Sequence, residues 1–373
     1  MSGTGIPDTR SPRTGEIPEL RIGFITHLDQ HDDLGSIYRD NLRLVQALET
    51  LGYDSAWIAT RHFKAGWATL PSPFAFYGAA AVSTERIALG TAVLPLLLDD
   101  PVRAAEEVSV VDHLSNGRLV LGLGKGVPSD SFHVFDSWNK NRDAGFVAKA
   151  ERLQWALEGS QVEGGSESLH PPNRSLSGRV LYGSSNLETI RRAAENGEGF
   201  ILERFGNGPE RTAAARRGFQ ERQAESIRIY RQVFEETWGD MRTPYVVLSR
   251  SAYPGPTVES ALAEAGTRVR RWNDFAARIG RVDPTWSVPD QLLSDNVPWG
   301  TPEVLAADLL ADPSVALSDE IVLGVHPAHH TIDETIEKAR ILLEELVPLV
   351  RSGWRAQREE LGIDELRTDR VTA

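Results

Sequence analysis

The strongest constraint on the fold is an alternation of short strand-like runs with amphipathic, helix-like segments, repeated along most of the chain. The strand-like runs are rich in β-branched and aliphatic residues. They lie at 20–26, 55–60, 87–93, 119–124, 179–182, 199–202, 245–249 and 320–325. A helix between successive strands makes the sheet parallel, and eight such strands close a barrel. The sequence therefore predicts an α/β protein with a (β/α)8 TIM barrel, with a doubly wound open sheet as the alternative.

Helix signals occupy the intervals between these runs. Residues 37–51 place apolar side chains at helical spacing and stop at Gly52. The clearest helix start follows the third strand, where Asp99 or Asp100 can cap and Pro101 suits the first turn. A helix over 332–350 is expected after the eighth strand.

Two polar stretches, 203–239 and 254–298, are expected to be helical insertions at the C-terminal face that roof the barrel mouth, with 203–240 as a candidate lid. No change in composition divides the chain. We therefore expect a disordered N-terminal tail at 1–19, one barrel domain at 20–352, and a charged C-terminal tail at 353–373.

Composition removes several classes of function. The chain contains no cysteine, which excludes disulfides, thiolate metal sites and a cysteine nucleophile. Its formal charge of −13 is opposite to the basic surface that nucleic-acid binding needs. No apolar stretch is long enough to span a bilayer, and the first residues lack the apolar core of a signal peptide. We expect a cytoplasmic protein without nucleic-acid or membrane partners.

The active site of a (β/α)8 barrel lies at the carboxyl ends of its strands, so the residues that follow each strand are the candidates. After the fifth strand, the small-residue turn Ser184–Asn186 leads into a helix. Its backbone N–H groups suit a phosphate, or the turn simply caps the helix. Lys125, which follows the fourth strand, can supply a positive charge to the same phosphate.

Two other patterns are less informative. The run Gly122 to Gly126 is not a dinucleotide fingerprint, because Val127 occupies the third glycine position. We interpret its glycines as room for the close approach of a flat ligand. His326, His329 and His330 follow the eighth strand without a carboxylate at ligand spacing, so no metal site is expected.

Several stretches together resemble the bacterial luciferase-like flavin monooxygenases. They are GYDSAWIATRHF, RIALGTAVLPLLLDDPVRAAEEVSVVDHLSNGRLVLGLGKG, YGSSNLETIRRAAENGEGFIL, WGTPEV and EIVLGVHPAHHTIDETIEKARILLEELVP. The second, with its P-V-R-x-A-E-E and D-x-L-S-x-G-R core, is highly specific. The resemblance covers nearly the whole chain after the first twenty residues and implies a barrel that binds flavin at the carboxyl ends of its strands.

The resemblance also implies a set of cofactor-binding residues. Phosphate-binding positions of the family fall on Lys125, on Arg142, and within the segment from Ser184 to Thr189. The residues implied within that last segment are Ser184, Ser185, Asn186 and Thr189. The family further implies a non-proline cis peptide beneath the flavin ring, which would join Ala92 and Val93.

One motif departs from the family pattern. Luciferases carry a paired histidine in an E-H-H-F motif after the second strand, whereas this chain has Thr60-Arg61-His62-Phe63. Arginine stays protonated and cannot act as a general base. Either His62 takes that role, or Arg61 stabilises a peroxy anion or an anionic substrate, or the chemistry differs. Light emission is not expected.

The function that the resemblance implies is an FMN-dependent monooxygenase. It would use reduced FMN from a separate flavin reductase, and O2, to oxygenate a small organic substrate through a flavin C4a-(hydro)peroxide. Arg61 and His62 would be its catalytic residues. The alternatives are F420-dependent hydride transfer on the same barrel and a non-catalytic flavin-binding subunit of a heterodimer. A homodimer is a family expectation.

Overall fold

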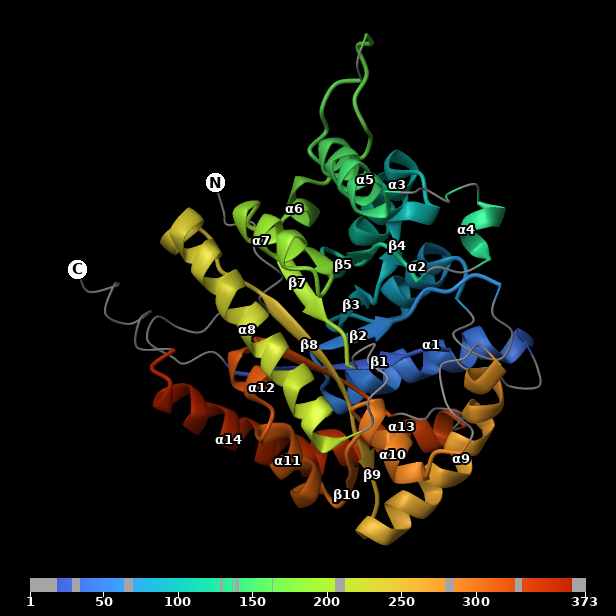
Figure 1. Ribbon diagram of the computed structural model, residues 1–373. Coiled ribbons are helices and arrows are strands. Elements are labelled where there is room, and N and C mark those ends of the chain that lie inside the picture. The colour runs from blue at the N-terminus through green and yellow to red at the C-terminus, as the bar shows by residue number, and fades with distance from the viewer. Residues whose placement is uncertain are drawn as a thin grey trace. The chain divides into compact units, whose positions relative to one another are not determined.

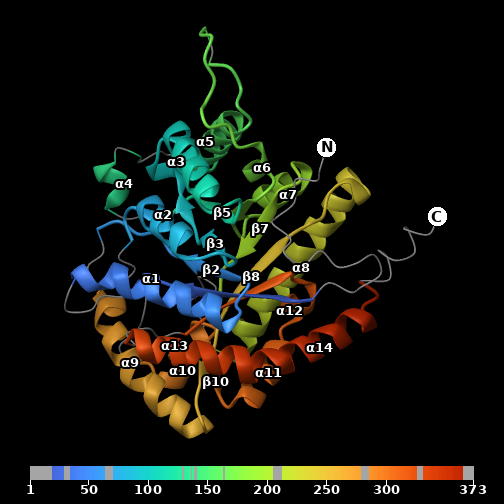
Figure 2. The same ribbon diagram turned by 180° about the vertical axis from the view of Figure 1, so that it is seen from behind.

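The computed structural model describes residues 19–28, 34–63, 70–127, 130–135, 137, 141–162, 164–204, 212–278, 285–325 and 331–363 (Figures 1 and 2). The expected N-terminal tail lies outside these residues except for Glu19, and so do His326, His329 and His330. In the described part of the chain, no helix combines the length and the apolar character that crossing a membrane requires.

Eight principal strands form the sheet. They are β1 Arg21–Thr26, β2 Ser55–Ile58, β3 Ala88–Thr91, β5 Leu119–Gly124, β6 Val180–Gly183, β7 Gly199–Leu202, β8 Val246–Ser251 and β11 Glu320–Gly324. Their order is β3-β2-β1-β11-β8-β7-β6-β5, and β3 also pairs with β5, which closes the ring. The short β4 (Leu94–Pro95) pairs with β5 beyond the end of β3. The predicted (β/α)8 TIM barrel is therefore confirmed.

Helices connect the strands. They are α1 Leu34–Leu51, α2 Pro73–Ser83, α3 Pro101–Leu114, α4 Ser131–Val134, α5 Arg142–Leu157, α6 Arg174–Ser177, α7 Leu187–Glu195, α8 Ala213–Trp238, α9 Val258–Arg278, α10 Val288–Ser294, α11 Pro302–Leu310, α12 Pro313–Leu317, α13 Ile332–Ile341 and α14 Val347–Glu360. The helix start predicted near residue 100 is present. Asp100 caps α3, because its side chain accepts hydrogen bonds from the backbone N–H groups of Val102 and Arg103, both at 2.9 Å.

The chain packs as two compact units. The first contains Ile25–Ile201 and Tyr230–Tyr245. In it α3 and α5 lie side by side in both views (Figures 1 and 2). A buried, bidentate ion pair between Asp112 of α3 and Arg179, with oxygen–nitrogen distances of 2.6 and 2.8 Å, fastens α3 to the start of β6.

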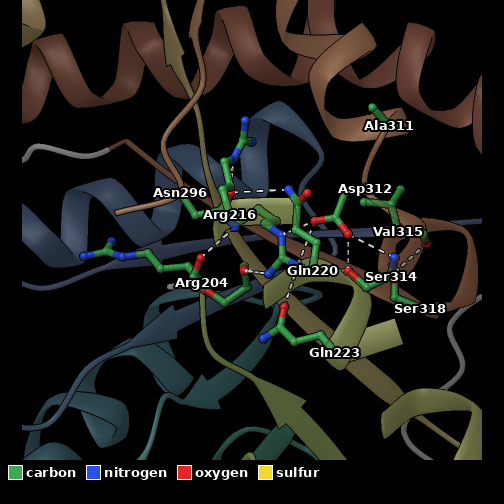
Figure 3. A network of polar contacts seen from close by, with 12 residues as sticks. Arg204, Arg216, Gln220, Gln223, Asn296, Ala311, Asp312, Ser314, Val315 and Ser318 are labelled. Carbon is green, nitrogen blue, oxygen red and sulfur yellow. Dashed lines mark hydrogen bonds and ion pairs between the residues drawn. The ribbon is translucent and has the colours of Figure 1, made fainter. Parts of the chain in front are cut away.

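The second unit contains Leu202–Ile229 and the chain from Val246 onward, together with the first part of β1. Arg250 of β8 is fully buried and donates to Asp312 at 2.8 Å, to Gln223 at 2.6 Å and to Ser314 at 2.9 Å. Figure 3 shows these three partners: Gln223 lies on α8, Ser314 on α12, and Asp312 caps α12. Because all of these groups are paired, the network joins strand to helices without leaving a buried charge uncompensated.

The candidate lid at 203–240 is a wrong prediction for the residues that the structure describes. They form a helix, as expected, but α8 lies along β7. Gln223 donates to the backbone oxygen of Glu203, just beyond the carboxyl end of β7, at 2.7 Å. Tyr230 donates to the backbone oxygen of Glu198, just before the amino end of β7, at 2.9 Å. The helix is therefore the crossover between β7 and β8.

The stretch at 254–298 is a helical insertion, as predicted. It begins directly after the carboxyl end of β8 and contains α9 and α10, flanked by β9 (Tyr253–Pro254) and β10 (Trp299–Gly300). Its apolar side chains gather into a small core of their own. The buried members are Tyr253, Ala261, Ala265, Val269, Leu292 and Val297. That it roofs the barrel mouth stays a prediction.

The boundary predicted for the C-terminal tail was placed too early. Helix α14 continues to Glu360, and the side chains of Trp354 and Arg358 are each only 1% exposed. The Arg358 guanidinium lies 4.6 Å from the centre of the Trp354 ring. Trp354 and Arg358 are four residues apart, so they lie on one buried face of the helix and this segment belongs to the fold. Residues 364–373 lie outside the described part.

Candidate active site

Four consecutive strands of the first unit bring most of the predicted site residues to one edge. Strands β2, β3, β5 and β6 are neighbours in the ring and all pair in parallel. Gly124 and Gly183 are register partners, so Lys125 and Ser184 follow the ends of adjacent strands. Because parallel strands share one carboxyl edge, Arg61–His62 and Ala92–Val93 lie on that same edge.

The Ala92–Val93 peptide bond is cis, as the resemblance implied. The Val93 side chain covers the glycines of the neighbouring strands. A Cβ atom on Gly183 would lie 2.8 Å from Val93 Cγ1, and one on Gly124 would overlap Val93 Cγ2. At Gly122 the corresponding space holds the backbone oxygen of Thr91. Our interpretation of these glycines as room for a flat ligand is therefore wrong for Gly122 and Gly124, because the space is filled by Thr91, the last residue of β3, and by Val93.

Lys125 directly follows β5 and places a cation at this edge. Its Nζ pairs with a carboxylate oxygen of Asp143, in the first turn of α5. The Lys125 side chain is 28% exposed, whereas that of Asp143 is 66% exposed. The lysine is thus partly enclosed, while its partner faces solvent.

Arg142 holds the loop that carries Lys125. Its Nη2 donates to the backbone oxygen of Lys125 at 2.8 Å and to that of Gly126 at 2.5 Å. Its guanidinium carbon lies 4.7 Å from the centre of the Phe132 ring. Nε is buried and has no hydrogen-bond partner among the described residues. Desolvation lowers the pKa of Arg142, which nevertheless remains a cation with an unused N–H.

At the turn after β6 the structure supports the helix-cap alternative. The Asn186 side chain accepts hydrogen bonds from the backbone N–H groups of Glu188 at 2.9 Å and Thr189 at 3.3 Å. Ser184 Oγ accepts from the backbone N–H of Asn186 at 3.0 Å, and Ser185 is exposed. A phosphate that used the first turn of α7 would have to take two N–H groups from Asn186.

His62 lies in the loop after β2, and one of its ring nitrogens makes no hydrogen bond to the described residues. Its Nε2 is buried and has no hydrogen-bond partner in the described part of the structure. The ring packs edge-on against Phe135, with centroids 4.9 Å apart and planes at 70°. Desolvation lowers the pKa of His62 below its usual 6.5, so the imidazole is neutral at neutral pH. A neutral imidazole with a free nitrogen can accept or pass on a proton.

The other residues of this loop are placed differently. Arg61 is half-buried, and its backbone N–H donates to the backbone oxygen of Leu70 at 3.2 Å. Thr60 Oγ1 is buried without a hydrogen-bond partner among the described residues. Buried polar atoms are normally paired, so unpaired ones at the carboxyl edge are suited to a ligand.

The sequence interpretation missed Asp143 and Thr60. Asp143 stands directly after Arg142 in the first turn of a helix, and an acidic residue beside a predicted phosphate ligand is the signal that points to it. No comparable signal marks Thr60. Among the residues that the structure describes, no group of histidine and carboxylate side chains could hold a metal ion.

Comparison with known proteins gives a family match for the chain. The family model for luciferase-like monooxygenases matches residues 20–316. A 4-hydroxyprotoasukamycin monooxygenase of Streptomyces nodosus subsp. asukaensis is 40% identical over 116 residues, which cover 30% of this chain and 31% of that protein. The aligned part is thus about a third of that relative.

Solved structures share the fold at low sequence identity. Monooxygenase RslO1 from Streptomyces bottropensis has a TM-score of 0.71 at 21% identity, covering 88% of this chain and 99% of that one. The oxygenating constituent of 3,6-diketocamphane monooxygenase from Pseudomonas putida, in complex with FMN, has a TM-score of 0.67 at 14% identity, covering 88% and 98%. An F420-dependent secondary alcohol dehydrogenase has a TM-score of 0.63 at 14% identity, covering 89% and 99%.

The family match extends over most of the chain, and the barrel has the fold of these structures. The chain belongs to the luciferase-like monooxygenase family.

Proposed function

We propose that this protein is an FMN-dependent monooxygenase that uses O2 on a small organic substrate. The observation that carries the proposal is that a cationic loop after β5 and a desolvated histidine after β2 both follow strands at the same carboxyl edge of the barrel. The family assignment supports oxygenation, and the FMN complex of the diketocamphane enzyme supports FMN as the cofactor.

The residues fit a flavin that carries a phosphate. Lys125 supplies a positive charge, and the buried, unused Nε–H of Arg142 is a donor without a protein acceptor in the described residues. A phosphate on these two groups would form charge-assisted hydrogen bonds. Ser184, Ser185 and Thr189 remain proposed phosphate contacts. They require that the backbone N–H groups of Glu188 and Thr189 exchange Asn186 for the phosphate as their acceptor.

Bound reduced FMN would supply the electrons that activate O2. His62 would hold or move a proton at Nε2, since its imidazole is neutral and unpaired there. Arg61, always protonated, would stabilise negative charge that develops on oxygen or on the substrate. A separate reductase would deliver the reduced flavin, and the functional form would be a homodimer.

The test measures the binding of flavin and the rate at which O2 reoxidises the bound reduced FMN. Under anaerobic conditions the protein is titrated with reduced FMN, oxidised FMN and F420, and the FMN complex is then mixed with O2 in a stopped-flow instrument. We expect reduced FMN to bind and the absorbance of oxidised FMN to return more slowly than for free flavin. Lys125→Met should weaken FMN binding about 10-fold or more, as expected when a charged partner is lost.

The alternatives give different results. Binding of F420 without binding of reduced FMN would replace the proposal by hydride transfer. FMN binding with unaltered reoxidation, and no oxygenated product from any substrate, would indicate a non-catalytic subunit. Either result overturns FMN-dependent oxygenation.

A further inference from the structure

The Lys125–Asp143 ion pair occupies the cation that the proposed function assigns to the FMN phosphate. We propose that Asp143 is a built-in competitor of that phosphate, which keeps FMN exchangeable. This inference rests on the proposed function and adds a residue that tunes cofactor affinity. Asp143 would be a positioning residue, because it acts through Lys125.

The fold fixes Asp143 close to Lys125. Asp143 lies in the first turn of α5, and the preceding residue, Arg142, fastens the backbone of Lys125 and Gly126 to that helix. Further along α5, Lys149 Nζ donates to the backbone oxygens of Leu97 at 3.0 Å and Asp99 at 2.5 Å. The helix is therefore tied down at both places, which fixes the position of the Asp143 backbone.

Helix capping does not require the Asp143 side chain. The N-cap of α5 is Asn141, whose Oδ1 accepts from the backbone N–H of Ala144 at 3.1 Å. A carboxylate in the first turn of a helix is favoured by the helix dipole. The structure thus places a carboxylate beside the cation that a phosphate would bind.

The exposure of the two partners sets the size of the effect. Asp143 is 66% exposed, so water and salt screen its charge, and an exposed ion pair of this kind is weak. The competition should therefore reduce affinity modestly, by about twofold to fivefold, and should not block binding. That is useful where reduced FMN must enter, and oxidised FMN must leave, in every turnover.

The experiment compares Asp143→Asn with the unaltered protein by equilibrium titration of oxidised FMN and of riboflavin, which lacks the phosphate. The variant should bind FMN about twofold to fivefold more tightly and release it more slowly, with riboflavin affinity unchanged. The gain should shrink at high salt. Asp143→Ser is the second variant and is used if Asp143→Asn folds poorly.

The matched control is Glu151→Gln. Glu151 lies on the same helix and pairs with Arg192 of α7, so its replacement makes the same change in net charge away from Lys125. It should leave the FMN affinity unchanged. In a Lys125→Met background, Asp143→Asn should lose its effect, because the cation for which the two anions compete is gone.

The outcomes separate this inference from the proposed function. If the unaltered protein prefers FMN to riboflavin but Asp143→Asn does not bind FMN more tightly, the inference is wrong and the proposed function stands. A gain that persists in the Lys125→Met background also refutes displacement, since it would reflect direct repulsion. If the unaltered protein binds FMN no better than riboflavin, the phosphate site itself is wrong.

Discussion

At the scale of single residues, the loop after β2 is the place where this chain departs from its family pattern. Arg61 stands where luciferases have a histidine, and His62 is the remaining titratable residue of the motif. The surroundings of His62 are apolar, with Phe135 packed edge-on against its ring. Burial without a counter-charge is what keeps an imidazole neutral and available for proton transfer.

His62→Gln tests this role. Desolvation lowers the pKa of His62, so the imidazole stays neutral down to a pH below 6.5 and is protonated only under more acidic conditions. Turnover limited by this base should therefore fall on the acidic side, and the variant should lose that acidic limb. Its rate should be lower by about 10²-fold or more.

The measurement is product formation with reduced FMN as a function of pH, once a substrate has been found. His133→Gln, which removes an exposed histidine on the nearby helix α4, is the control and should keep the acidic limb. An identical pH profile for His62→Gln and the unaltered protein would rule His62 out as the base.

At the scale of elements, the segment after β3 packs across β5 and β6. Val93 fills the space above Gly124 and Gly183, and these glycines are required because a Cβ atom would meet a branched, inflexible side chain. The carboxyl edge of the barrel is thus closely packed where the cofactor would lie. Close packing of this kind holds the site residues in place.

Gly124→Ala should lower the free energy of unfolding by about 1–3 kcal/mol, because overpacking forces the Val93 side chain or its strand to move. The double variant Val93→Ala/Gly124→Ala should recover much of this loss, since the remaining Cβ of residue 93 would lie 3.5 Å away. Denaturant unfolding provides the measurement.

Gly78→Ala is the control for this pair. Gly78 lies within α2 with no atom within 4 Å of an added Cβ, so alanine should be neutral or stabilising there. If Gly124→Ala were as stable as the unaltered protein, Val93 would not exclude a Cβ atom at position 124, and the packing argument would be wrong.

The periodic elements could be predicted from the sequence, and the contacts between them could not. The bounds of β5 and β7 match their aliphatic runs, and α3 begins at its predicted cap and proline. The end of α14 was missed because its buried Trp354 and Arg358 stand among charged residues. The Lys125–Asp143 pair and the cover that Val93 gives Gly124 depend on tertiary packing, which local patterns do not record.

At the scale of the whole molecule, a barrel separates residues that act in catalysis, at the carboxyl edge, from residues that act in stability, at the amino edge. Glu198 lies at the amino edge, just before β7, and is buried. Its carboxylate accepts hydrogen bonds from Gln154 at 2.5 Å, Tyr182 at 3.2 Å and Asn196 at 3.3 Å. Desolvation outweighs these donors and raises the pKa of Glu198.

A raised pKa in the folded state makes the contribution of Glu198 to stability greatest when the group is protonated. That contribution is fully present below the usual Glu pKa of 4.5 and is lost as the pH rises through the raised value. Glu198→Gln, which mimics the protonated form, should therefore raise the Tm by a few degrees at pH 7. The difference from the unaltered protein should vanish as the pH approaches 4.5.

The same variant tests the separation of the two edges. Glu198→Gln should leave FMN affinity unchanged, whereas Gly124→Ala, at the carboxyl edge, should alter both stability and FMN binding. Thermal unfolding across pH tests the predicted change in Tm, and titration with FMN tests the affinity. Glu151→Gln, at an exposed site, is the control for the loss of one negative charge. A Glu198→Gln protein less stable than the unaltered protein at every pH would mean that the three hydrogen bonds to the carboxylate outweigh its burial, and the direction inferred for its pKa would be wrong.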